Sequence, residues 1–222
     1  MNKLMQPLIW LISLVPGIYL AVIWNKLPAE VAMHFDINGK PDRYGSKNEL
    51  LLMAAILFFL SIGLYYLMAN IHRIDPKRYA DENRSRFKKI GFAVSLFLSA
   101  LTVFIIYSSS NGGSRMDVNI ILTAVALLMA VIGNYMPNLK PNYFAGMRLP
   151  WTLENPDNWR ATHLLAGKIW FWGGLALAVF CFILPPAIAT IIFIAGIFAM
   201  VLIPAIFSWR FYQQQKRSGP VS

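Results

Sequence analysis

Two arginines and a histidine lie close together in the chain, between two apolar blocks, and could bind an anion. Arg148, Arg160 and His163 carry nitrogen donors that suit a phosphate or a carboxylate. Residues 155–157 (NPD) have the pattern of a helix start, and a helix N-terminus would add positive potential there. No nucleophile or metal partner lies near the histidine in the sequence, and acid–base chemistry needs such a set of groups. If these side chains have a functional role, we therefore expect binding and not catalysis.

These side chains belong to a polar segment, residues 133–168, which has two parts. Three prolines and a glycine within 136–153 exclude regular helix over most of the first part. From Pro156 on, Trp159 and Trp170 recur with His163 at helical spacing, which predicts a helix leading into the next apolar block. The segment is either a recognition surface or a re-entrant or interfacial plug whose polar groups satisfy one another. The candidate binding residues are Asn134, Asn142, Tyr143, Arg148, Trp151, Trp159, Arg160 and His163.

A second polar loop, residues 25–49, has the punctuation of an ordered hairpin. Its NGKP stretch (38–41) signals a turn, and VAMHFDI (31–37) contains the β-favouring Val, Phe and Ile. His34 and Asp36 lie two residues apart, so on a strand they would share a face as a hydrogen-bonded pair. We expect no metal there, because the further ligands are missing, and no cofactor elsewhere. The candidate residues of this loop are His34, Asp36, Asn38, Arg43 and Tyr44.

The composition indicates that both loops connect membrane spans. Hydrophobic residues make up 57% of the 222 residues and charged residues 14%, against roughly 45–50% and about 25% in soluble domains. A bilayer core needs about 20 helical residues to cross it. Six blocks without a central charge predict an all-α protein with six transmembrane helices: Pro7–Trp24, Leu50–Asn70, Ile90–Tyr107, Val118–Met136, Ile169–Leu184 and Ala187–Phe207.

Two of these blocks have features that admit more than one interpretation. Pro185 and Pro186 separate the last two blocks and predict a tight helical hairpin. The alternative is one long kinked helix. The first block follows Lys3 as a signal peptide would, but no small-residue cleavage site comes after it, so we expect a first span. The single cysteine, Cys181, lies in an apolar block and is expected to be a small buried side chain.

The positive charges predict which side of the membrane each loop faces. Five of the 20 lysines and arginines fall on one side, and the other 15 fall on the side that holds both termini. The positive-inside bias makes the richer side cytoplasmic, so both termini and the 133–168 segment are expected inside and the 25–49 loop outside. Anionic cytoplasmic lipid explains the net charge of +10, so we expect no direct contact with nucleic acid. The five on the outer side are Lys26, Lys40, Arg43, Lys47 and Arg115.

The same two polar loops resemble a known family. Together with the six spans, they are similar to the SdpI family of bacterial membrane immunity proteins and to the small N-terminal domain that often precedes it. The matching stretches are GNYMP, KPNYFAGMRLPWTL and NWRATHLLAGK in the second loop and LPAEVAMHFDINGKPDRYGSK in the first. This divides the chain into an N-terminal membrane module (1–70), a basic cytoplasmic loop (71–89) and an SdpI-like helical module (90–222).

The resemblance implies a function at the bacterial cytoplasmic membrane. The family's namesake protects its cell from a secreted peptide toxin that attacks the membrane. With toxin bound, it also captures a cytoplasmic repressor. The expected partners are therefore membrane lipids, a toxin outside and a transcriptional repressor inside. Two alternatives are a transporter, which the absence of charges from the span interiors disfavours, and a membrane enzyme acting on lipid or peptide.

Overall fold

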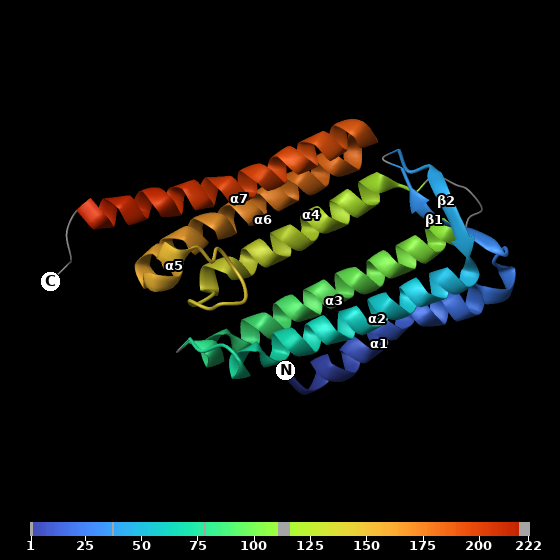
Figure 1. Cartoon of the computed structure of the whole chain (residues 1–222), viewed down its shortest axis with the longest axis horizontal. Coiled ribbons are helices and arrows are strands. Elements are labelled where there is room, and N and C mark those ends of the chain that lie inside the picture. The colour runs from blue at the N-terminus through green and yellow to red at the C-terminus, as the bar shows by residue number, and fades with distance from the viewer. Residues whose placement is uncertain (1, 37, 78, 111–115, 218–222) are drawn as a thin grey trace.

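The computed structural model describes residues 2–36, 38–77, 79–110 and 116–217. Arg78 and Arg115, which entered the charge distribution, lie outside these ranges. Figure 1 shows long helices running side by side, with one small sheet at one end. The elements are α1 (Asn2–Ile23), η1 (Trp24–Lys26), β1 (Glu30–Phe35), β2 (Pro41–Ser46), α2 (Lys47–Asn70), η2 (Ile71–Arg73), α3 (Ala80–Ser110), α4 (Val118–Tyr135), η3 (Met136–Asn138), α5 (Pro150–Glu154), α6 (Pro156–Ile183) and α7 (Pro186–Arg217).

The predicted all-α membrane fold is confirmed. Six helices within the described ranges are long and apolar enough to cross a membrane, and each overlaps one predicted block. The tight hairpin is also confirmed, because α6 ends at Ile183 and α7 begins at Pro186. Two bounds differ from the sequence analysis. The helix α3 begins at Ala80, so much of the 71–89 loop is helical, and the short helix α5 interrupts the irregular part of the second loop.

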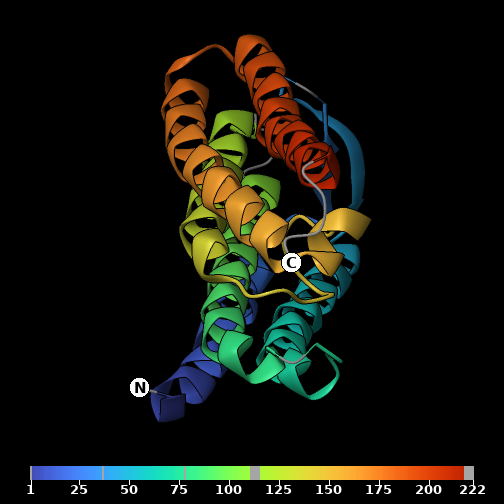
Figure 2. The same cartoon turned by 90° about the vertical axis from the view of Figure 1, so that its left-hand side faces the viewer.

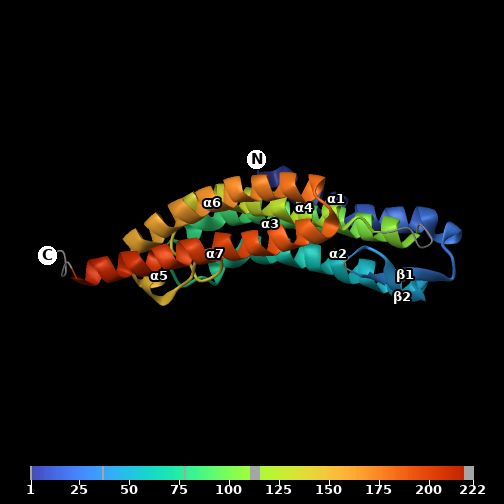
Figure 3. The ribbon, with the colours of Figure 1, turned by 90° about the horizontal axis from the view of Figure 1, so that it is seen from above.

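The helices form two bundles of three. α1, α2 and α3 pack together, α4, α6 and α7 pack together, and α3 lies beside α4 where the bundles meet (Figures 1 and 3). Apolar side chains point outward from both bundles, as expected of helices that face lipid. Each polar loop bridges the two bundles, one at each end.

Small polar side chains join the helices of the first bundle. Ser13 and Ser61 are buried, and their hydroxyls lie 3.1 Å apart, which links α1 to α2. The Ser95 hydroxyl donates to the Ser61 carbonyl at 2.8 Å and links α3 to α2. Hydrogen bonds of this kind hold helices together in lipid, where the hydrophobic effect does not act between them.

Glycines allow close contact between α4 and α6 in the second bundle. A Cβ on Gly174 would lie 2.7 Å from the Ala126 carbonyl oxygen, and one on Gly167 would lie 2.9 Å from the Gly133 carbonyl oxygen. Both distances are shorter than van der Waals contact, so the two helix backbones approach closely only because the side chains are absent.

The two ends of the molecule differ in character. The sheet lies at one end, whereas α5 and the end of α7 lie toward the other (Figure 1). Figure 2 looks onto the end with α5 and shows the chain after α4 crossing over the helix ends. An even number of spans places both termini on the same side of the membrane. With the positive-inside bias, the end with α5 is the cytoplasmic one in our proposed orientation.

Candidate functional site

The helix start predicted in the second loop is present. The Asn155 side-chain oxygen accepts hydrogen bonds from the Asp157 and Asn158 amides at 2.9 and 3.0 Å, and Pro156 occupies the first turn of α6. The Asn155 side-chain amide also donates to Gln215 at 2.7 Å. The cap therefore fixes where α6 begins and ties that point to the end of α7.

His163 is fully buried, and both of its ring nitrogens are engaged inside the protein. The Met147 amide donates to Nε2 at 3.1 Å, so Nε2 carries the lone pair. Nδ1 lies 2.8 Å from the Trp159 carbonyl oxygen and therefore carries the hydrogen. The ring also stacks on Trp159, with 3.9 Å between centroids. In this arrangement the imidazole is neutral and has no free donor for an anion.

Gly146 allows the chain to pass over the histidine. Its φ is +102°, a backbone conformation that other residues adopt at a cost. A Cβ at this position would overlap Nε2 of His163. The GMR stretch (146–148) of the second loop and the first turns of α6 therefore depend on each other.

Buried asparagines give the irregular chain between η3 and α6, here called the 138–155 segment, its shape. The Asn142 side-chain oxygen accepts from the Phe144 and Ala145 amides at 2.9 and 2.8 Å. Asn83 on α3 pairs with the backbone of Lys140 through two bonds: its amide donates to the Lys140 carbonyl at 3.0 Å, and its oxygen accepts from the Lys140 N–H at 2.9 Å. The segment is thus bound to the first bundle.

Aromatic side chains fix the segment to the second bundle. The indole of Trp159 is buried and donates to the Leu139 carbonyl at 2.7 Å. The indole of Trp151 donates to the Ser208 hydroxyl at 2.8 Å and packs edge-on against Trp209, with 4.8 Å between centroids. The indole N–H groups of Trp151 and Trp159 therefore both have partners within the protein.

The remaining candidate residues are exposed and do not converge. Arg148 donates to the Tyr143 carbonyl at 2.7 Å, and both line a cavity of about 410 Å³. Arg160 lines a different cavity, of about 280 Å³. Asn134 is exposed on α4. The structure therefore does not bring Arg148, Arg160 and His163 together around one anion, as the sequence suggested.

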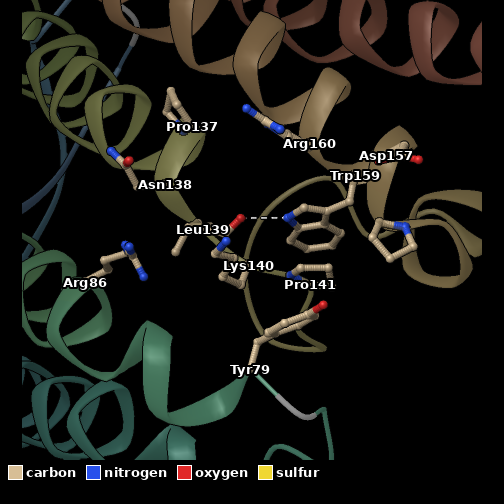
Figure 4. A pocket seen from close by; sticks show the side chains of 11 residues that line it. Tyr79, Arg86, Pro137, Asn138, Leu139, Lys140, Pro141, Asp157, Trp159 and Arg160 are labelled. Carbon is tan, nitrogen blue, oxygen red and sulfur yellow. Dashed lines mark hydrogen bonds between the residues drawn. The ribbon is translucent and has the colours of Figure 1, made fainter.

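The smaller cavity contains cationic residues that the sequence analysis did not select. Arg86 on α3, Lys140 in the 138–155 segment and Arg160 on α6 all line it, and Figure 4 shows these side chains around the space between the three elements. We call it the basic cavity. In the sequence, Arg86 belongs to the basic loop 71–89. Its position opposite Arg160 depends on how α3 packs. The full lining is Tyr79, Arg86, Pro137, Asn138, Leu139, Lys140, Pro141, Pro156, Asp157, Trp159 and Arg160.

At the other end, the predicted hairpin is present. The strands β1 and β2 are antiparallel, with Val31 opposite Gly45, and we call residues 30–46 the outer hairpin. Gly39 adopts a φ of +74° in the turn, and its carbonyl accepts from the Met116 amide at 2.8 Å. Ser46 and Glu49 form a capping box at the start of α2. The hairpin is thus attached to both bundles, through α2 and through the entry to α4.

The predicted pairing of His34 with Asp36 is wrong. β1 ends at Phe35, so Asp36 lies in the turn, where it accepts from the Asn38 and Lys40 amides, both at 2.8 Å. These backbone hydrogen bonds, the one from Lys40 first, hold the pKa of Asp36 below its usual value. His34 instead contacts Asp42 across the hairpin, with 2.5 Å between Nδ1 and Oδ1. Arg43 lies 3.4 Å from Glu49, and Tyr44 is 52% exposed.

Comparison with known proteins finds matches that include parts of both loops. The chain is a multi-pass helical protein of the bacterial cytoplasmic membrane. Residues 138–208 match the SdpI/YfhL protein family, and residues 11–58 match a domain of unknown function (DUF1648). Immunity protein SdpI of Bacillus subtilis (strain 168) is 22% identical over 196 residues, which cover 87% of this chain and 88% of that protein. No solved structure matches the chain. The resemblance predicted from the sequence is confirmed.

Proposed function

We propose that this protein protects its cell from a secreted peptide toxin that attacks the membrane. The observation that carries the proposal is the similarity to Immunity protein SdpI, which extends over 87% of this chain and 88% of that protein. A relative that shared only a span or two would support the membrane location alone. Similarity over most of both chains supports a shared task as well.

The outer hairpin is the surface that we expect to meet the toxin. It lies at the end opposite α5 (Figure 1), and that end faces outward in our orientation. His34, Asn38, Arg43 and Tyr44 are exposed on it. Its attachment to α2 and to the entry of α4 keeps these side chains in fixed positions, which lowers the entropy cost of binding.

We propose that protection is achieved by binding. The nitrogens of His163 are both occupied, so this side chain is not available for proton transfer. Within the described ranges, no three His, Cys, Asp or Glu side chains gather closely enough to hold a metal ion. The transporter alternative receives no specific support, since Ser13, Ser61 and Ser95 in the spans are hydrogen-bonded to one another's helices.

Signalling to a cytoplasmic repressor is the second part of the proposal. The 138–155 segment exposes Tyr143 and Arg148 at the inner end, beside Lys77, whose ammonium lies 5.0 Å from the Tyr143 ring centroid. A tagged candidate repressor should move from the cytoplasm to the membrane when toxin is added. Arg148→Ala should prevent that movement while leaving protection intact. An unchanged distribution with the wild-type protein would remove this part.

A matched pair of tyrosines tests the protective function. Tyr44 on the outer hairpin is 52% exposed, and Tyr143 at the opposite end is 46% exposed. A sensitive bacterial strain that expresses the protein is challenged with a panel of secreted membrane-active peptide toxins. We expect survival with the wild type and with Tyr143→Ala, and killing with Tyr44→Ala at equal membrane levels. Killing of wild-type cells by every toxin in the panel would refute the function. Equal survival with both variants would refute the role of the hairpin.

A further inference from the structure

The basic cavity brings together cationic side chains from three separate parts of the chain. Arg86 comes from α3, Lys140 follows η3, and Arg160 lies in the second turn of α6 (Figure 4). These positions are 20 to 74 residues apart in sequence. Bringing like charges together costs free energy, so a space that they share favours an anionic occupant.

Much of the hydrogen-bonding capacity around the cavity is unused. Within the part of the chain that the structure describes, Arg160 makes no hydrogen bond or ion pair. Arg86 uses Nη1 to donate to the Glu82 carbonyl at 2.5 Å, and a guanidinium has four further N–H groups. Lys140 lies 4.0 Å from the carboxylate of Glu82, at the limit of an ion pair.

The negative groups nearby do not balance these charges. Asp157 is the acidic residue on the cavity wall, against three cations. Glu82 lies beside Lys140, and with both carboxylates counted the three cations still leave one positive charge without a partner. α6 also begins at the wall, and its dipole adds positive potential at Pro156. The Asp157 and Asn158 amides are occupied by Asn155, so the helix contributes its field and not these N–H groups.

The walls of the cavity are held in place. Trp159 is buried and bonded to the Leu139 carbonyl, and Asn83 pairs with the backbone of Lys140. The cations therefore project from fixed backbone, which reduces the entropy lost on binding. The volume of about 280 Å³ accommodates a phosphate group with a short substituent.

We propose that the basic cavity binds a phosphate group whose negative charge is not neutralised by a cation in the same ligand. Two arginine forks and a lysine match the several acceptor oxygens of a phosphate. The exposed Tyr143 and the Trp151–Trp209 pair lie at the same end, as aromatic side chains do at headgroup level. Two sources share this chemistry: the headgroup of an anionic phospholipid and a free phosphate or phosphate ester. The proposal is independent of the protective function.

The full-length protein in a neutral detergent provides the test. Short-chain phosphatidylglycerol, short-chain phosphatidylcholine and inorganic phosphate are each titrated at constant ionic strength, and the midpoint of thermal unfolding is followed. A ligand that binds only the folded state raises the midpoint. Arg86→Gln and Arg160→Gln remove cavity cations. Arg84→Gln and Arg148→Gln are the controls, because both are exposed arginines outside the cavity.

We expect phosphatidylglycerol or inorganic phosphate to raise the midpoint more than phosphatidylcholine does. Each cavity variant should weaken the apparent affinity about tenfold or more, since each loses charge-assisted hydrogen bonds. The controls should stay within about twofold. A response to phosphatidylglycerol alone identifies a lipid headgroup, and an equal response to phosphate identifies a soluble ligand. No rise with either, or equal losses in Arg148→Gln and Arg160→Gln, would overturn the proposal.

Discussion

Replacing Gly146 by alanine tests how the 138–155 segment is held on α6. The substitution forces a residue with a Cβ into a backbone conformation with φ of +102°, which costs about 1–2 kcal/mol. The new methyl group would also overlap Nε2 of His163 and displace the Met147 amide from it. Loss of that hydrogen bond adds about 0.5–1.5 kcal/mol. We therefore expect the free energy of unfolding to fall by about 2–3 kcal/mol.

The assay is thermal unfolding of the purified protein in detergent. At about 2–4 °C for each kcal/mol in a chain of this size, Gly146→Ala should lower the midpoint by about 4–12 °C. Gly63→Ala is the matched control, because it lies in α2 with no atom within 4 Å of the added Cβ and without positive φ. It should leave the midpoint unchanged or raise it slightly.

A double variant separates the two causes. In a His163→Ala background the overlap is gone, so adding Gly146→Ala should cost only the backbone conformational free energy, about 1–2 kcal/mol. If Gly146→Ala proves as stable as Gly63→Ala, the histidine does not hold the segment in the way described. If its cost is the same in both backgrounds, the contact with His163 contributes nothing.

Three further predictions concern the link between the bundles, the orientation and the outer hairpin. Asn83→Ala should lower the free energy of unfolding by about 2–3 kcal/mol, because it leaves Lys140 backbone groups without partners, and the exposed Asn134→Ala should change it by less than about 0.5 kcal/mol; chemical denaturation measures both. Asn38→Cys should react with a membrane-impermeant maleimide in intact cells, and Lys216→Cys only after permeabilisation; the reverse pattern would invert the topology. The native cysteine is buried and gives little background. The folded-state pKa of Asp36 lies below the unfolded value of 3.8, so the stability that its carboxylate contributes should be complete above that pH and lost as the pH falls further. A carbon-13 NMR titration of that carboxyl group checks this, and a midpoint above 3.8 would contradict it.

The spans, the turn and the helix start were predictable because each depends on local sequence. Apolar length alone predicts the six helices. The NGKP turn needs a residue that accepts positive φ, and Gly39 supplies it. The cap at Asn155 is specified by a few adjacent side chains. Each of these features is decided within one or two helical turns of chain.

The contacts within the two loops were not predictable, because they join residues from distant elements. The two-residue spacing suggested that His34 faces Asp36, but β1 ends at Phe35, and His34 contacts Asp42 on the neighbouring strand instead. Helical spacing placed His163 on a face of α6 without showing that the Met147 amide would reach it. Likewise, the basic cavity forms only because α3 lies against the 138–155 segment. No local sequence pattern predicts that packing.

The protective function is tested most directly by the membrane potential of sensitive cells during exposure to a secreted membrane-active peptide toxin. A potential-sensitive dye follows depolarisation in cells that express the wild-type protein, Tyr44→Ala or Tyr143→Ala at equal membrane levels. The account predicts that the potential is maintained with the wild type and Tyr143→Ala and collapses with Tyr44→Ala. If wild-type cells depolarise as fast as cells without the protein for every toxin tried, the protective function is contradicted.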